Sequence, residues 1–383
     1  MRSMISLRTG GRKLMKLFRI PKAPKAYLDI VKLLAIVLVV FNHSGRNGYT
    51  MYMDVQAEPA STLIMFFSAF VKIAVPLFFM ASGALLLRKE EPYGTVLVKR
   101  ALRFALILLA ISFFFYYDAN AKNGTISVQD FLIHLYKNDI YGHLWYLYSY
   151  VCYMLMLPLL RKLAKLMKAQ DYLLLIVAYQ VMQLLPAADY ALFRGTAVHT
   201  SYIKIFAAEN YVVYPLLGYF IDSRTEEDER EETFFVLLFL SILALAGNCM
   251  LLHWRYDLEG AWTSANKEAY MGSLSLLPAI TVFYGLKRLF AKHPVKEKTA
   301  KVLFVLGSCT FGVYLFDPKW RLFTQSVRLA LKPVIGLYAA THVQTICACL
   351  LGLAATFLFK CVTGGLGLIV RGIAEDHKLE KSL

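Results

Sequence analysis

Long apolar runs separated by short polar segments occupy most of the chain. A helix needs about 20 predominantly apolar residues to cross the hydrocarbon core of a bilayer, and about ten runs approach that length. In chain order they cover residues 27–44, 62–87, 98–117, 143–160, 172–185, 202–221, 234–252, 270–286, 302–316 and 341–359. The fifth and ninth runs are short for a span. The pattern predicts an all-α fold, a polytopic membrane helix bundle with about ten transmembrane helices.

The placement of basic residues predicts how these spans are oriented. Lysine and arginine concentrate in cytoplasmic loops of membrane proteins, and the segment before the first run is basic and carries no acid. Further cations fall in alternate loops, namely Arg88, Lys89, Lys99, Arg100, Arg103, Arg161, Lys162, Lys165, Lys168, Lys287, Arg288, Lys292, Lys296, Lys298 and Lys301. The predicted inner loop 224–232 is acidic, but acids count little in this rule. Both termini are therefore predicted to be cytoplasmic, with a basic leader at 1–26, a transmembrane domain at 27–372 and a tail at 373–383.

The composition favours a membrane protein over a nucleic-acid binder. Hydrophobic residues make up 58% and charged residues 18% of the 383 residues. A soluble domain with this balance would leave too much apolar surface in water. The net charge of +16 could attract nucleic acid, but the cations lie in short segments between apolar runs, which favours membrane lipid as the partner. The six cysteines show no metal-ligand spacing, so we expect no metal site.

The first apolar run contains ionisable residues at both ends. Asp29 and Lys32 lie near its start and His43 lies at its end. Ionisable groups inside a membrane span are costly, so they mark function more often than in a soluble core. Lys32 and His43 would be about 16 Å apart along a helix. This spacing suits an extended, anionic, activated donor that lies through the membrane.

Other titratable residues are predicted to lie at the same outer depth as His43. They belong to three further spans and are His143, Glu209 and Asp317. A histidine beside a carboxylate is the usual arrangement for general-base work, because the carboxylate fixes the tautomer and stabilises the imidazolium. The alternative interpretation is that these groups only meet the lipid headgroups. Lys72, another charge within a span, is interpreted as a partner for an acid or as a snorkelling side chain.

The segment after Asp317 alternates basic and apolar residues. Its cations are Lys319, Arg321, Arg328 and Lys332. They are interleaved with large apolar side chains, which is typical of an amphipathic segment that lies on the outer membrane surface. The second interpretation is a basic rim for an anionic acceptor.

The first span resembles the signature of the acyltransferase 3 family of membrane O-acyltransferases. In that family an Asp-x-x-Arg precedes a histidine, and Asp29, Lys32 and His43 occupy those positions. The following elements are similar to family segments and occur in family order: VPLFFMASGALLL, VKRALRFALIL, HLWYLYSYVCYMLMLPLL, YPLLGYFI and TFGVYLFDP. Two positions depart from the pattern. Lys32 replaces the usual arginine and loses its bidentate fork, and Asp317 replaces a late histidine.

The resemblance implies that the protein transfers an acyl group, commonly acetyl, from cytoplasmic acyl-CoA to a hydroxyl of an extracytoplasmic glycan or related surface molecule. His43 would deprotonate the acceptor hydroxyl or form an acyl-histidine intermediate. The residues that would hold the donor are Asp29, Lys32, Ser82, Gly83, Lys99, Arg100 and Arg103. Those that would hold the acceptor are Trp145, Tyr146 and Tyr314, although Trp145, Tyr146 and Tyr148 fit an aromatic interface belt equally well.

The expected location is the plasma membrane of a bacterium. Two other functions remain compatible with the pattern: a transporter or exporter of a surface lipid, glycan precursor or amino acid, and a membrane sensing or scaffold subunit. Many transporters repeat their halves, and no second copy of the first-span or second-span motif occurs in the chain. The acceptor, the acyl chain length, the oligomeric state and the need for a partner protein stay open.

Overall fold

The computed structural model describes residues 17–18, 20–44, 48–53, 60–121, 124, 126–193, 205, 209–225, 231–260 and 272–380. All regular elements in these residues are helices, which confirms the all-α prediction for them. The chain divides into two compact units. We call Met1–Gly48 with Leu286–Leu383 the terminal unit, and Tyr49–Gly285 the central unit.

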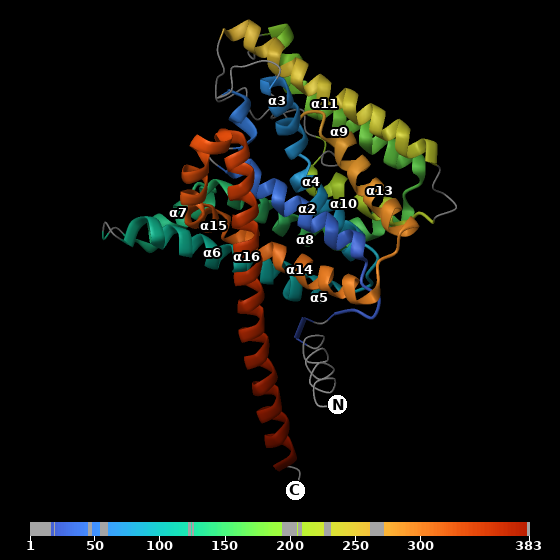
Figure 1. Ribbon diagram of the computed structural model, residues 1–383. Helices are drawn as coiled ribbons and strands as arrows, with labels where there is room; N and C mark the ends of the chain where they lie inside the picture. The colour runs from blue at the N-terminus through green and yellow to red at the C-terminus, as the bar shows by residue number, and fades with distance from the viewer. Residues whose placement is uncertain are drawn as a thin grey trace. The chain divides into compact units, whose positions relative to one another are not determined.

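The terminal unit is formed by both ends of the chain. Its helices are α2 (Ala26–His43), α14 (Glu297–Leu315), α15 (Asp317–Phe323) and α16 (Gln325–Glu380). Helix α2 packs against α14, and α16 packs against α2, α14 and α15 (Figure 1). A Cβ atom on Gly307 of α14 would lie 2.6 Å from Oδ1 of Asp29. Gly307 therefore lets α14 approach α2 where α2 carries its buried acid.

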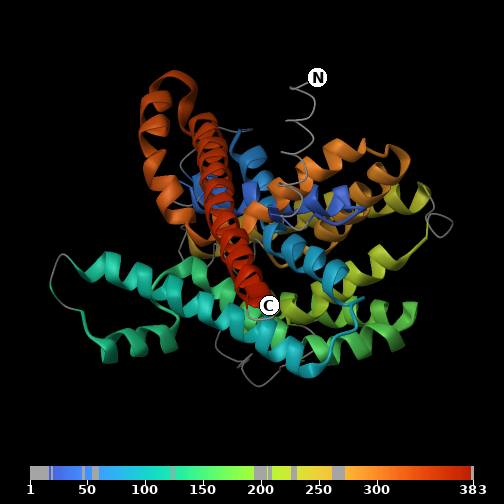
Figure 2. The same ribbon diagram turned by 90° about the horizontal axis from the view of Figure 1, so that it is seen from below.

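Helix α16 contains one break, at Gly336. This residue has φ 80° and ψ 163°, a conformation that L-residues with a side chain rarely adopt. The chain turns back at this point, so α16 has a short arm before Gly336 and a long arm after it (Figures 1 and 2). The long arm includes the predicted tenth span, and the short arm belongs to the segment predicted to lie on the membrane surface.

The remaining helices belong to the central unit, except that η1 begins at Gly48 and α13 continues past Gly285, so both cross the boundary between the units. Their bounds are η1 (Gly48–Met53), α3 (Ala60–Val71), α4 (Ala74–Leu86), α5 (Tyr93–Val96), the π-helix η2 (Leu97–Ala101), α6 (Leu102–Asn120), α7 (Val128–Lys137), η4 (Gly142–Leu144), α8 (Trp145–Leu166), α9 (Ala169–Phe193), α10 (Asn210–Ser223), α11 (Glu231–Glu259) and α13 (Leu276–Lys292). Helix α10 packs against α4, α8 and α9, while α11 packs against α3.

The closest helix packing in the central unit depends on two glycines. A Cβ atom on Gly83 of α4 would overlap the backbone of Pro215, and one on Gly218 of α10 would overlap the backbone of Met80. Small residues allow this close approach, and membrane helices use it because lipid gives them little hydrophobic drive to associate. The absence of side chains at these two positions thus brings α4 and α10 into direct backbone contact.

Seven helices of the described chain are long and apolar enough to cross a membrane. They are Ala26–His43, Ala60–Leu86, Gly142–Leu166, Ala169–Asp189, Glu231–Asp257, Glu297–Leu315 and Gln325–Gly364. The other three predicted spans fall on α6, α10 and α13, of which α10 has 14 residues and α13 has 17. The structure therefore supports a membrane helix bundle, while the count of ten and the cytoplasmic termini stay predictions.

Lys72 interrupts the predicted second span. A turn at Lys72 and Ile73 separates α3 from α4. The Lys72 ammonium lies 3.5 Å from the centre of the Tyr49 ring, a cation–π contact that stabilises a cation in a poorly hydrated place. An aromatic ring thus contacts this charge, a partner that the sequence did not indicate.

Replacing Gly83 or Gly218 with alanine is expected to lower the melting temperature of the detergent-solubilised protein. Each added methyl group would overlap helix backbone, and overpacking of this kind typically costs about 1–3 kcal/mol. Gly94→Ala is the matched control, because among the described residues nothing lies within 4 Å of its Cβ position. Equal melting temperatures for all three variants would show that the glycines do not limit the α4–α10 contact.

Candidate active site

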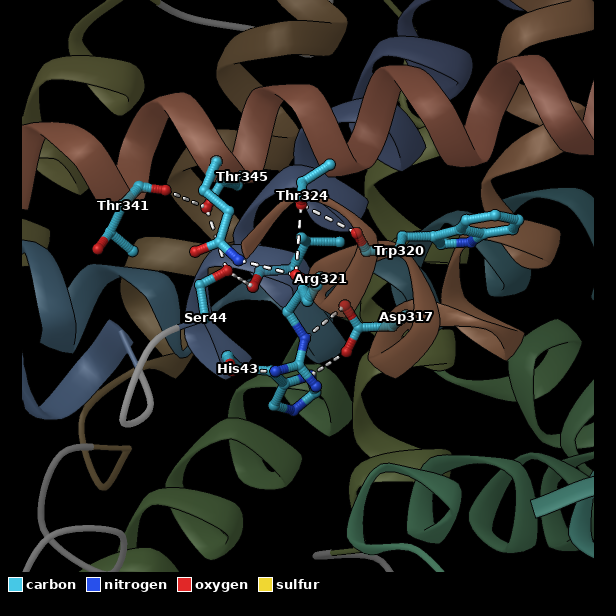
Figure 3. A network of polar contacts seen from close by, with 10 residues as sticks. His43, Ser44, Asp317, Trp320, Arg321, Thr324, Thr341 and Thr345 are labelled. Carbon is cyan, nitrogen blue, oxygen red and sulfur yellow. Dashed lines mark hydrogen bonds and ion pairs between the residues drawn. The ribbon is translucent and has the colours of Figure 1, made fainter. Parts of the chain in front are cut away.

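The centre of the candidate site is a contact between His43 and Asp317. Nδ1 of His43 lies 2.9 Å from Oδ2 of Asp317 (Figure 3). The Asp317 side chain has no exposed surface, whereas 25% of the His43 side chain is exposed. These two residues are 274 positions apart in the chain. The fold therefore pairs the predicted base with a predicted carboxylate from a different helix.

Local chain geometry places both residues at helix ends. Helix α2 ends at His43 because Ser44 is extended, and the Ser44 hydroxyl donates to the carbonyl of Val40 at 2.7 Å. Helix α14 ends at Leu315, and Phe316 has φ −110° and ψ 19°. Helix α15 then begins with Asp317 and Pro318, a favourable start because proline fits the first helical turn. An acid in the first turn also interacts well with the helix dipole.

Arg321 is the third member of the cluster. Its Nε donates to Oδ1 of Asp317 at 3.1 Å, and its Nη1 donates to the backbone carbonyl of His43 at 2.5 Å. The guanidinium thus balances the buried carboxylate and also ties the end of α2 to α15 (Figure 3). Arg321 belongs to the segment predicted to lie on the outer membrane surface or to form a basic rim for an anionic acceptor. In the structure its side chain contacts Asp317 and His43 of the candidate site.

Helix α16 supports the cluster through hydrogen bonds to backbone and hydroxyl groups. Gln344 Nε2 donates to the carbonyl of Arg321 at 2.9 Å. The hydroxyls of Ser44 and Thr345 lie 3.3 Å apart, and Thr345 donates to the carbonyl of Thr341 at 2.8 Å. Figure 3 shows the contacts of Ser44, Thr341 and Thr345 beside the His43–Asp317 pair. Residues from α2, α15 and α16 are therefore held in one network.

This geometry can support proton transfer. A carboxylate that accepts a hydrogen bond from Nδ1–H keeps the imidazole proton on Nδ1. The other nitrogen, Nε2, then has a free lone pair. The partly exposed ring can then take a proton through Nε2, while Asp317 stabilises the imidazolium that forms. The hydrogen bond to Asp317 thus sets the tautomer of His43.

Asp29 and Lys32 form an ion pair near the other end of α2. Lys32 Nζ is 2.6 Å from Oδ1 of Asp29, and it lies 5.9 Å from the centre of the Phe304 ring. Asp29 is buried, and Lys32 is partly exposed. Asp29 therefore balances part of the Lys32 charge in the structure. The predicted donor-binding role of both residues stays a prediction.

His143 and Glu209 belong to the central unit, apart from the unit that holds His43 and Asp317. His143 is buried, and its ring packs edge-to-face against Phe115 and Tyr141 with centroid distances of 5.3 and 5.1 Å. Glu209 is exposed and lies just before α10 without capping that helix through its side chain. Their convergence with His43 stays a prediction.

The predicted donor cations of the central unit differ in their surroundings. Lys99 and Arg103 are exposed. Arg100 donates from Nε and Nη2 to the two carboxylate oxygens of Glu91 at 2.9 and 2.5 Å. This hydrogen bonding, together with that of Arg161, lowers the pKa of Glu91 to about 2 against the opposing effect of partial burial. Glu91 and Arg161 were not predicted as site residues.

The predicted small and aromatic positions take part mainly in helix packing. Gly83 lies against α10, and the Ser82 hydroxyl is 3.2 Å from that of Tyr150. Tyr146 is buried with its ring 5.1 Å from that of Phe79. Trp145 is exposed, while Tyr314 is buried in the terminal unit. Their binding roles stay predictions, and Trp145 is the most exposed of the three aromatic residues.

Arg321 had a local signal in the sequence. Residues four apart on a helix lie on the same face and form ion pairs, and Asp317 and Arg321 have this spacing. The prediction followed the amphipathic pattern of the whole segment and did not use this local pair. Gln344 and Thr345 had no comparable signal, because their partners are 23 and 301 positions away. Among the described residues no group of three His, Cys, Asp or Glu side chains could hold a metal ion.

A comparison with known families identifies the chain. A family model described as an acyltransferase domain matches residues 25–361. This range includes His43, Asp317 and Arg321, which we call the His43 cluster, and it also includes Glu91, Arg100 and Arg161. No curated protein and no solved structure matches the chain.

Replacing Arg321 with glutamine is expected to lower the melting temperature, because the fully buried Asp317 carboxylate would lose its guanidinium partner. Hydrogen bonds to charged groups contribute about 1.5–3 kcal/mol. Lys332→Gln, which removes an exposed cation of the same unit, should have little effect. Adding Asp317→Asn to Arg321→Gln should recover part of the loss. If Arg321→Gln melts like Lys332→Gln, the guanidinium does not stabilise the buried acid.

Proposed function

Because the chain belongs to the acyltransferase 3 family, a family of membrane acyltransferases, we propose that it transfers an acyl group from cytoplasmic acyl-CoA to a hydroxyl of an extracytoplasmic glycan or related surface molecule. Acetyl is the proposed acyl group. The observation that carries this proposal is the His43–Asp317 pair at the end of α2. It is the arrangement that an oxygen nucleophile needs for activation by a general base.

In the proposed reaction the acceptor hydroxyl attacks the thioester carbonyl of the donor. Nε2 of His43 takes the hydroxyl proton as the new C–O bond forms, and the C–S bond then breaks. The sulfur of CoA leaves with the electron pair and takes the proton back from the imidazolium. Asp317 keeps the ring oriented and balances its transient positive charge. An alternative route passes through an acyl-His43 intermediate, in which the ring nitrogen itself attacks the thioester.

The proposed donor site uses the remaining charged and small residues of the family motifs. Anionic phosphates of acyl-CoA would bind cations, which give strong charge-assisted hydrogen bonds. The proposed donor residues are Lys32, Asp29, Ser82, Gly83, Lys99, Arg100 and Arg103. Trp145, Tyr146 and Tyr314 are the proposed acceptor residues, and His143 and Glu209 are proposed to assist catalysis. The proposed location is the plasma membrane of a bacterium.

His43→Ala is expected to reduce acyl transfer by about 100- to 10,000-fold, the usual cost of losing a general base. The measurement is mass spectrometry of labile acyl groups on glycans from cells that express each variant at equal membrane levels. His134→Ala is the control, because His134 is an exposed histidine that contacts Asp130 and Asp139 outside the candidate site. Retention of more than about a tenth of the transfer by His43→Ala would exclude the general-base role.

Cross-membrane transfer also requires His43 and Lys99 to face opposite sides. Single cysteines at Asn47, outside the described residues, and at Thr95 test this in a background without the six native cysteines. An impermeant thiol reagent should label Asn47→Cys on intact cells and Thr95→Cys only after permeabilisation, because the cations beside Thr95 favour the cytoplasm. Labelling of both positions from one side would contradict the proposed orientation.

A further inference from the structure

Two guanidinium groups of the central unit converge on a single carboxylate. Arg100 holds both oxygens of Glu91, and Arg161 Nη2 donates to Oε2 of Glu91 at 2.8 Å. Two cations and one anion leave an excess positive charge at this point. We call Arg100, Arg161 and Glu91 the Glu91 cluster. It differs from an ordinary surface ion pair because its two cations exceed what one carboxylate can neutralise.

Arg161 is the buried member of the Glu91 cluster. Only 8% of its side chain is exposed, and its Nε donates to the carbonyl of Leu86 at 3.0 Å. Its Nη1 is buried and, among the described residues, has no hydrogen-bond partner. A buried donor without an acceptor is costly. The Nη1 group of Arg161 is thus available to donate to a further acceptor oxygen, on the same guanidinium group that Glu91 contacts.

The backbone around the Glu91 cluster also departs from regular structure. Arg100 lies in the π-helix η2, an element that frequently marks functional sites. Glu91 lies in the non-helical segment just before Pro92, between α4 and α5. The cations are therefore carried by helices, whereas the carboxylate is carried by a short linker. Glu91 can therefore move away from Arg161 without the unfolding of a helix.

We propose that Arg100 and Arg161 form a binding site for a phosphate of the acyl donor, and that Glu91 occupies this site until the phosphate displaces it. The inference rests on the proposed function, because it assigns the site to acyl-CoA. It adds Arg161 as a donor-binding residue and Glu91 as an internal competitor.

The chemistry of the cluster fits a phosphate better than a second carboxylate. A phosphate group offers three acceptor oxygens and up to two negative charges, so it can serve both guanidinium groups and the remaining Nη1 donor of Arg161. A planar guanidinium group can donate two parallel hydrogen bonds to two oxygens of one phosphate. Glu91 offers two oxygens and one charge. A phosphate would therefore satisfy the charge and the donors of the cluster more completely than Glu91 does.

The experiment measures CoA binding to purified, lipid-reconstituted protein by calorimetry. Glu91→Gln is expected to bind CoA about tenfold more tightly, because the neutral amide competes weakly for two guanidinium groups. Arg161→Gln is expected to bind it about tenfold more weakly, with Arg161→Lys in between since it keeps the charge and loses the fork. Glu90→Gln is the matched control, because the neighbouring Glu90 is 81% exposed and pairs with Lys165.

Pantetheine, which has no phosphate, is the control ligand, and its affinity should be the same for all variants. If Glu91→Gln binds CoA no more tightly than Glu90→Gln does, the inference is wrong, and Glu91 serves only to hold two helices together. This result is independent of the folding of Arg161→Gln. Acetyl transfer from acetyl-CoA by the unaltered protein tests the proposed function separately. Transfer without tighter CoA binding by Glu91→Gln overturns only the inference, whereas tighter binding without transfer overturns only the function.

Discussion

The buried carboxylate of Asp317 is the constraint on which the terminal unit depends. An isolated buried carboxylate is costly unless it is paired and hydrogen-bonded, and this one has no exposed surface. His43 and Arg321 both contact it, and Arg321 also binds the end of α2. Satisfying one charge therefore brings together helix ends that are distant in the chain. The same contacts fix the orientation of the imidazole ring.

The helices that carry these groups can pack closely because small residues lie at their contacts. Gly307 makes room for Asp29 between α14 and α2, and Gly83 and Gly218 bring α4 and α10 into backbone contact. In a membrane environment such contacts replace much of the hydrophobic drive that water supplies to soluble proteins. Close packing and internal charge pairing are thus complementary: the first sets helix positions, and the second uses those positions to neutralise buried charge.

The sequence predicted the apolar helices better than their ends. The first span was predicted at 27–44 and α2 is Ala26–His43, because polar residues bound a long apolar run that only Asp29 and Lys32 interrupt. The ninth was predicted at 302–316, but α14 begins at Glu297, where hydropathy is low and a Glu297–Lys301 pair four residues apart supports the helix. The predicted topology also placed His43 and Asp317 at the same depth, which suggested that a histidine could meet a carboxylate there. It did not reveal that Arg161 meets Glu91, because nothing local connects positions 70 residues apart.

The two charge clusters differ in the sign of the group that is buried. In the His43 cluster the acid is buried and the base is partly exposed, whereas in the Glu91 cluster the cation Arg161 is buried and 22% of the Glu91 side chain is exposed. Burial fixes a group and raises the cost of losing its partner. In the pairs His43–Asp317 and Glu91–Arg161 the more exposed member is therefore the one able to exchange partners. For His43 the proposed exchange is of a proton at Nε2. For Glu91 it is the carboxylate itself, which lies on a linker and can give way to another anion. The same burial rule thus makes one cluster suited to proton transfer and the other to anion exchange.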